Sequence, residues 1–171
     1  MNRLFELLAA RGWKVVVHPE PALRLPADVT SRYPRLPDEV KGFLGQIECC
    51  LNPQEDAWLL GAPDYVKTPD VAFPWDAIEQ LALESCDSAA ERAEQASFWD
   101  NHFPIAISVR ADDDYLAVCL SADAFGSVVH GYAPVASRRP CRQRRRLSAS
   151  CEKRQTPSAV SDRILPSPSD P

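Results

Sequence analysis

The sequence lacks any apolar run approaching the about 18 residues that a membrane-spanning helix requires. Its first residues, MNRLFELLAARGWK, place Glu6 and Arg11 among the apolar positions, which argues against a secretory signal. We therefore expect a cytoplasmic protein, in which the six cysteines stay mostly reduced and serve as small buried hydrophobes.

Several chemical motifs are also missing. The chain has no P-loop, GxGxxG, GxSxG or HExxH pattern, which leaves no sequence support for a nucleotide site, an acyl-transfer nucleophile or a zinc protease centre. It has no CxxC spacing, so neither a zinc site nor a thioredoxin-like motif is indicated. We expect no cofactor and no metal.

Basic residues are scarce in the first four fifths of the chain. Residues 1–137 carry 10 Lys and Arg against 21 Asp and Glu, a net charge of −11, whereas residues 138–171 carry 9 against 3, a net charge of +6. An acidic body argues against nucleic acid as its partner, since phosphates require a basic face. It suits a basic protein partner, because complementary fields speed and select encounters.

The length predicts one domain with a sizeable core. We expect a helix from Asn2 to Arg11, with Leu4, Leu7 and Leu8 on its apolar face and Gly12 as its stop. After this helix we expect a strand over Trp13–Val17 and then a proline-rich connector. Pro37 opens a second helix, whose apolar stripe is Val40, Phe43, Leu44 and Ile47. A strand over Ala57–Leu60 follows.

Two further helices are expected between residues 75 and 100. The first covers Trp75–Cys86. The second begins after Ser88, where Glu91 completes a capping box, and runs to Asp100, with Asn101 as a left-handed stop.

Residues 98–134 predict a three-stranded antiparallel meander. Ile105, Ile107 and Val109 alternate with smaller residues, which predicts a strand with one buried face. Residues 115–120 are apolar at both parities, as in a central strand covered on both sides. Gly126 closes a second turn before a strand over residues 127–132.

This order of segments resembles the Smi1/Knr4 (SUKH) family, where an aromatic-proline segment, an acidic turn, a DYLAL-like strand and a VVHGY-like strand follow one another. LPDEV with Phe43-Leu44 is similar to the helix that precedes the sheet in that family. The Gly-rich turn that many members carry near here is replaced by Cys49-Cys50-Leu51-Asn52. The resemblance implies an α+β fold over residues 1–137, with a largely antiparallel sheet packed against several helices.

The same resemblance implies a protein-interaction module without enzymatic activity. In bacteria the family is associated with immunity proteins that bind and neutralise a cognate toxin, often a nuclease or deaminase. A general scaffold or regulatory protein is the alternative, and gene neighbourhood separates the two. A small enzyme that uses His130 and Cys119 is the third possibility, since adjacent strands would bring them close. Burial of Cys119 in a central strand argues against it.

Acidic turns are the candidate partner-binding residues. Asp112, Asp113 and Asp114 form one turn, and Glu55 and Asp56 lie in another. Three consecutive carboxylates point in different directions, which is unlike the converging oxygen ligands of a calcium or magnesium site. A solvated turn is the simpler interpretation, and partner recognition is the functional one.

Residues 138–171 differ from all that precedes them. Arg, Ser and Pro make up 19 of the 34 positions, with almost no aliphatic periodicity, so we expect this basic tail to be disordered. Its abrupt start suggests out-of-frame translation, since nothing here matches the amphipathic C-terminal helix of the family. A functional basic tail and an inert extension are the alternatives.

Overall fold

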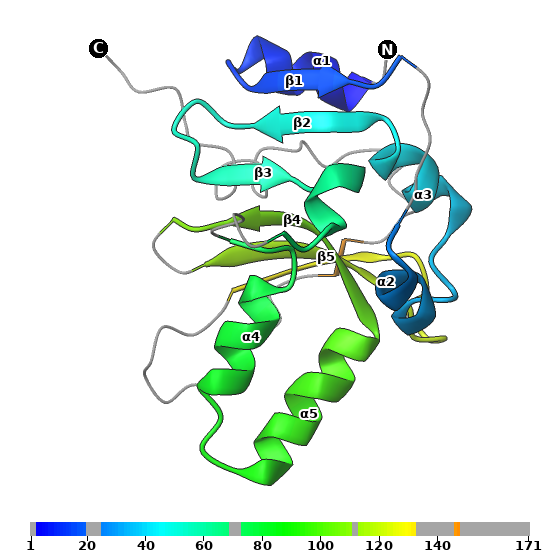
Figure 1. The fold of residues 1–171 in the computed structure, drawn as a ribbon, viewed down its shortest axis with the longest axis vertical. Coiled ribbons are helices and arrows are strands. Elements are labelled where there is room, and N and C mark those ends of the chain that lie inside the picture. Colours follow the sequence, from blue (N-terminus) through cyan, green and yellow to red (C-terminus); the bar gives the residue numbers. More distant parts are fainter. Residues whose placement is uncertain (1–2, 20–24, 69–72, 111–112, 133–145, 148–171) are drawn as a thin grey trace.

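The computed structural model describes residues 3–19, 25–68, 73–110, 113–132 and 146–147. Within them the chain forms an α+β fold in which one antiparallel sheet is packed against helices (Figure 1). The strands are β1 (Lys14–Val17), β2 (Ile47–Leu51), β3 (Ala57–Leu59), β4 (His102–Ser108), β5 (Asp114–Cys119), β6 (Val128–Tyr132) and the two-residue β7 (Arg146–Leu147). The helices are α1 (Arg3–Ala10), α2 (Ala27–Arg32), α3 (Asp38–Leu44), the 3-10 helix η1 (Ala62–Tyr65), α4 (Ala77–Glu84) and α5 (Ala89–Asp100).

The strands lie side by side in their order along the chain, from β1 to β7. Every neighbouring pair is antiparallel. The predicted three-stranded meander is therefore confirmed as β4, β5 and β6, which lie between residues 102 and 132. β5 is buried on both faces, as its composition predicts, but β4 is buried on both faces as well.

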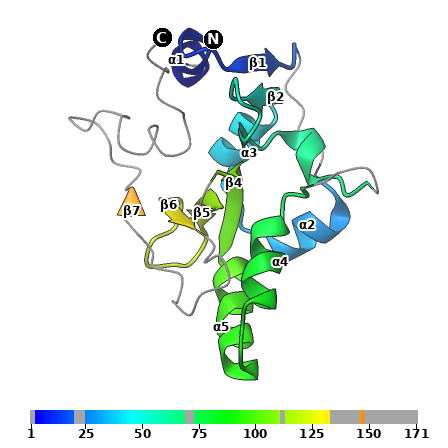
Figure 2. The ribbon, with the colours of Figure 1, turned by 90° about the vertical axis from the view of Figure 1, so that its left-hand side faces the viewer.

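Two apolar clusters cover the two faces of the sheet. Successive residues of a strand point to opposite faces, and on β4 Ala106 belongs to one cluster and Ile107 to the other. The larger cluster collects side chains from α2, α3, η1, α4 and α5, including Tyr65, Ile78 and Trp99. The smaller one is built on Phe5 and Leu8 of α1. Figure 2 shows α1 beside β1 at the top of the view and α4 and α5 at the bottom, below β4.

A close approach explains the glycine in β6. Tyr115 on β5 is paired with Gly131 on β6, and a Cβ atom at Gly131 would overlap the hydroxyl and ring of Tyr115. Tyr115 is 1% exposed and lies against Trp99, with ring centroids 4.8 Å apart. The glycine thus makes room for an aromatic side chain that joins the sheet to α5.

Several expectations need correction. On α1 the buried residues are Phe5 and Leu8, while Leu4 and Leu7 are exposed, because only one side of the helix meets the sheet. Ile47 starts β2 and does not continue the stripe of α3. Asn101 ends α5 with φ −108, outside the left-handed region.

The proline-rich connector contains a helix that the sequence analysis missed, α2. No helix in the described ranges is both long and apolar enough to cross a membrane. The disorder predicted for residues 138–171 lies outside the described residues, except at Arg146 and Leu147, which pair with β6.

Candidate interaction surface

The two acidic turns that the sequence singles out lie next to each other at one end of the sheet. The backbone N–H of Val109, at the start of the β4–β5 turn, donates to the carbonyl of Asp56 in the β2–β3 turn, at 2.8 Å. Arg110 Nε lies 3.3 Å from Asp56 Oδ2. Because β3 and β4 are antiparallel, the turn before β3 and the turn after β4 lie at the same end of the strands. Glu55, Asp56 and Asp113 therefore share one surface. We call residues 52–56 together with Val109, Arg110 and Asp113 the turn surface.

A buried asparagine builds the first turn. Asn52 is 2% exposed, and its Oδ1 accepts hydrogen bonds from the backbone N–H groups of Asp56 and Ala57, both at 3.0 Å. Its Nδ2 donates to Asp56 Oδ1 at 2.6 Å. Glu55 takes a left-handed conformation, with φ 58, and its side chain is exposed. The turn therefore presents Glu55 to solvent and holds Asp56 inward.

The second turn presents Asp113. Its φ is 48, and its backbone N–H donates to the carbonyl of Arg110 at 3.3 Å. The side chain of Asp113 is half-buried. Asp112 lies outside the described residues.

Asp114 does not belong to the surface that the sequence analysis assigned to it. It is 6% exposed and begins β5, and its Oδ1 lies 3.0 Å from Nε2 of His130 on β6. Strand alternation turns this carboxylate toward His130, away from the turn. The carboxylate of Asp114 is therefore buried and bonded to His130, and Asp114 is not an exposed residue that a partner could contact.

The turn surface is acidic in part only. Asp56 is paired with Arg110. Gly12 packs against Pro53, since a Cβ added at Gly12 would lie 3.3 Å from Pro53 Cγ. The exposed Arg11, which precedes Gly12, therefore lies beside the same end of the sheet. Of the other two carboxylates on this surface, Glu55 is exposed and Asp113 is half-buried.

His130 and Cys119, the two residues of the possible catalytic pair, are hydrogen-bonded to other residues and not to each other. His130 bonds Asp114, whereas Cys119 Sγ lies 2.9 Å from Ser121 Oγ. Cys119 and His130 are both buried. His102, and not His130, is the register partner of Cys119. No group of three or more His, Cys, Asp and Glu in the described ranges is arranged to hold a metal ion.

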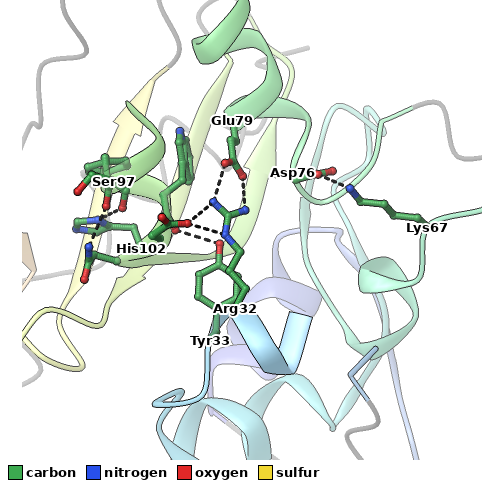
Figure 3. Close-up of polar contacts among 11 residues, drawn as sticks. Arg32, Tyr33, Lys67, Asp76, Glu79, Ser97 and His102 are labelled. Carbon is green, nitrogen blue, oxygen red and sulfur yellow. Dashed lines mark hydrogen bonds and ion pairs between the residues drawn. The ribbon is translucent and has the colours of Figure 1, made fainter. Parts of the chain in front are cut away.

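A polar cluster between helices escaped the sequence analysis (Figure 3). Arg32 at the end of α2 donates to both carboxylate oxygens of Glu79 on α4, each at 2.7 Å, and to Asp100 Oδ1 on α5 at 3.0 Å. The hydrogen bond to Glu79 raises the pKa of the Arg32 guanidinium above its ordinary value. These partners are 47 and 68 residues from Arg32, a separation that local spacing does not reveal.

The neighbouring contacts make this cluster a structural clamp. Tyr33 donates through its hydroxyl to the carbonyl of Trp99 at 3.0 Å, and burial raises its pKa. Lys67 Nζ lies 2.5 Å from Asp76 Oδ2, at the start of α4. The hydrogen bonds of Arg32 and Tyr33 to residues of α4 and α5 thus hold the end of α2 against these two helices.

No family profile, curated protein or solved structure matches the chain.

Proposed function

We propose that this protein is a non-enzymatic interaction module that binds a basic protein partner, and that it acts as an immunity protein against a cognate toxin domain. The observation that carries the proposal is the turn surface, where two loops distant in sequence are bonded together and the exposed Glu55 points to solvent. Surface loops held by a rigid sheet are a common place for recognition.

The charge distribution supports the same partner chemistry. The net charge of −11 over residues 1–137 attracts a basic toxin, such as a nuclease whose active site binds phosphates. An inhibitor that covers an electropositive active site needs only complementary shape and charge. The resemblance of residues 98–134 to Smi1/Knr4-like sheets is an additional, associational argument.

The direct test uses the toxin domain encoded beside this gene. Purified toxin domain is titrated into the full chain by calorimetry, and toxin activity is measured with and without the chain. We expect one-to-one binding and loss of toxin activity. Absence of binding, or turnover of a substrate by the purified chain itself, would contradict the proposal.

A charge-matched pair of variants locates the interface. The double variant E55Q/D113N removes two carboxylates from the turn surface, and we expect the association rate to fall about three- to tenfold at 0.15 M salt. The control D87N/E94Q removes two exposed carboxylates from α4–α5 and should leave the rate within about twofold. Equal effects from both variants would place the interface elsewhere.

A further inference from the structure

The chain carries two parts of opposite charge. Residues 1–137 have a net charge of −11, whereas residues 138–171 have +6, and six of the nine residues 138–146 are arginines. Opposite charges attract, and two parts of one chain meet at a high effective concentration because a linker joins them. The arginine-rich segment therefore competes with other cations for the acidic body.

β7 is the place where the structure joins these two parts. Arg146 and Leu147 pair antiparallel with Val129 and Val128 of β6. β6 in turn is paired along its whole length with β5, the middle strand of the meander, which is buried on both faces. The end of the arginine run is thus held by backbone pairing on the central sheet of the acidic body.

This pairing brings more than one positive charge to the body. Arg144 and Arg145 directly precede Arg146 in the sequence. Consecutive Cα atoms are about 3.8 Å apart, so the Cα atom of Arg144 is at most about 7.6 Å from that of Arg146. The Debye length at physiological ionic strength is about 8 Å. The charges of all three arginines therefore act on the same part of the body, even in the presence of salt.

We propose that the arginine-rich segment that ends in β7 is an internal competitor of a basic partner, and that its attachment to β6 slows the association of that partner with the body. This inference rests on the proposed function, because it describes how binding of a basic partner is regulated. The segment offsets part of the charge of −11 that attracts such a partner. Its contact is autoinhibitory, since the same chain supplies the acidic body and the cations that mask it.

Hydrogen exchange in the full chain tests the contact without any partner. Alternate N–H groups of a strand face its two neighbours, so one amide of the pair Val128 and Val129 faces β7 and the other faces β5. The variant R146P/L147P removes both N–H groups of β7. We expect one of the two amides to exchange at least about tenfold faster in this variant, while the other keeps the rate of the parent. No change at either amide, or the same change at both, would overturn the contact.

Charge removal from the segment tests the competition. The probe is a fluorescent hepta-arginine peptide, titrated into the full chain at about 0.1 M salt and followed by anisotropy. The variant R144Q/R145Q/R146Q removes three positive charges from the segment. Since a tethered segment competes at a high effective concentration, we expect this variant to bind the peptide about three- to tenfold more tightly than the parent.

A charge-matched control separates this competition from the effect of net charge. The variant K14Q/R35Q/R92Q also removes three positive charges, all from exposed positions of the body. Its affinity for the peptide should stay within about twofold of the parent. Equal affinities of the two variants, or no binding of the peptide to any of the three chains, would overturn the competition.

The toxin domain encoded beside this gene distinguishes this inference from the proposed function. If it binds the parent and R144Q/R145Q/R146Q at the same rate, the proposed function stands and the internal competitor does not. If it binds neither chain while the exchange and peptide results are as expected, the internal competitor stands and the immunity role does not.

Discussion

Arg32 and Glu79 form a two-point contact, with Nη1 and Nη2 of the arginine each 2.7 Å from a carboxylate oxygen of Glu79. The geometry matches the planar guanidinium to the planar carboxylate, and the Glu79 side chain is only 10% exposed. Because Arg32 also bonds Asp100, one side chain joins α2 to both α4 and α5. The contact makes the position of the α4–α5 pair depend on a residue in the proline-rich connector.

Removal of this arginine should destabilise the protein. R32A leaves Glu79 without its partner in a mostly buried place, and we expect a loss of about 2–4 kcal/mol in the free energy of unfolding, measured in urea. K41A is the control, since it breaks the exposed pair with Asp38 and should cost less than about 1 kcal/mol. Similar losses in the two variants would show that the clamp adds little.

Gly131 and Gly42 should respond in opposite directions to the same substitution. G131A places a methyl group into Tyr115, and overpacking of this kind typically costs about 1–3 kcal/mol. G42A adds a methyl group on α3 where no atom lies within 4 Å, and alanine in a helix is more favourable than glycine by about 0.5–1 kcal/mol. Thermal unfolding of both variants beside the parent checks the prediction. If G131A is as stable as the parent, the side chain of Tyr115 shifts to make room for the methyl group, which would contradict the prediction.

His102 should make stability depend on pH. Burial lowers the pKa of its imidazole, and Nδ1 lies 2.8 Å from the carbonyl of Phe98, which can only accept a hydrogen bond. The folded state thus binds the proton more weakly than the unfolded state, whose histidine titrates near 6.5. His102 therefore contributes fully above about pH 6.5, and stability falls as the pH drops toward the lowered pKa, by at most about 1.4 kcal/mol per pH unit.

H102N separates this histidine from other titrating groups. Asparagine keeps a side-chain N–H but does not titrate in this range. The difference in melting temperature between pH 7.5 and pH 5.5 should be smaller in H102N than in the parent. An identical difference would assign the pH response to other residues.

The adjacent cysteines of β2 should react at different rates. Burial raises the pKa of the Cys50 thiol to about 12, and Cys50 is 2% exposed. Cys49 points to the opposite face of the strand and is half-buried. Alkylation with iodoacetamide under native conditions, followed by mass spectrometry, should modify Cys49 before Cys50. In urea the two rates should converge. Equal rates in the native protein would contradict the burial of Cys50.

The meander was predictable because its pattern is local. Alternating or continuous apolar runs separated by Gly126 and by aspartates identify β4, β5 and β6 without knowledge of distant contacts. The start of α5 is a similar case, since Ser88 Oγ accepts from the backbone N–H of Glu91, as the capping box predicts.

β2 and α2 were not predictable in this way. Ile47 continues the spacing of the α3 stripe, and the residues after it become a strand only because β1 and β3 lie on either side. α2 is only six residues long, and its prolines suggest a connector, yet Val29 and Arg32 fasten it to the core and to the clamp. Tertiary contacts decide both segments.

The sequence identified the acidic turns but not their relationship. Nothing in the spacing indicates that Asp56 lies beside Arg110, or that Asp114 faces His130, since both contacts follow from strand register. Three adjacent aspartates look equivalent in the sequence. Strand pairing makes Asp114 different from Asp113, because the ladder begins between them.

β3 and β4 are neighbours, although η1, α4 and α5 separate them in the sequence, and Leu60 N–H donates to the carbonyl of Ile105 at 2.9 Å. The chain thus leaves the sheet and returns to almost the same place. The far end of this excursion, residues 87–94, is exposed at every position. Related proteins can therefore lengthen, shorten or replace that tip while the ladder stays intact.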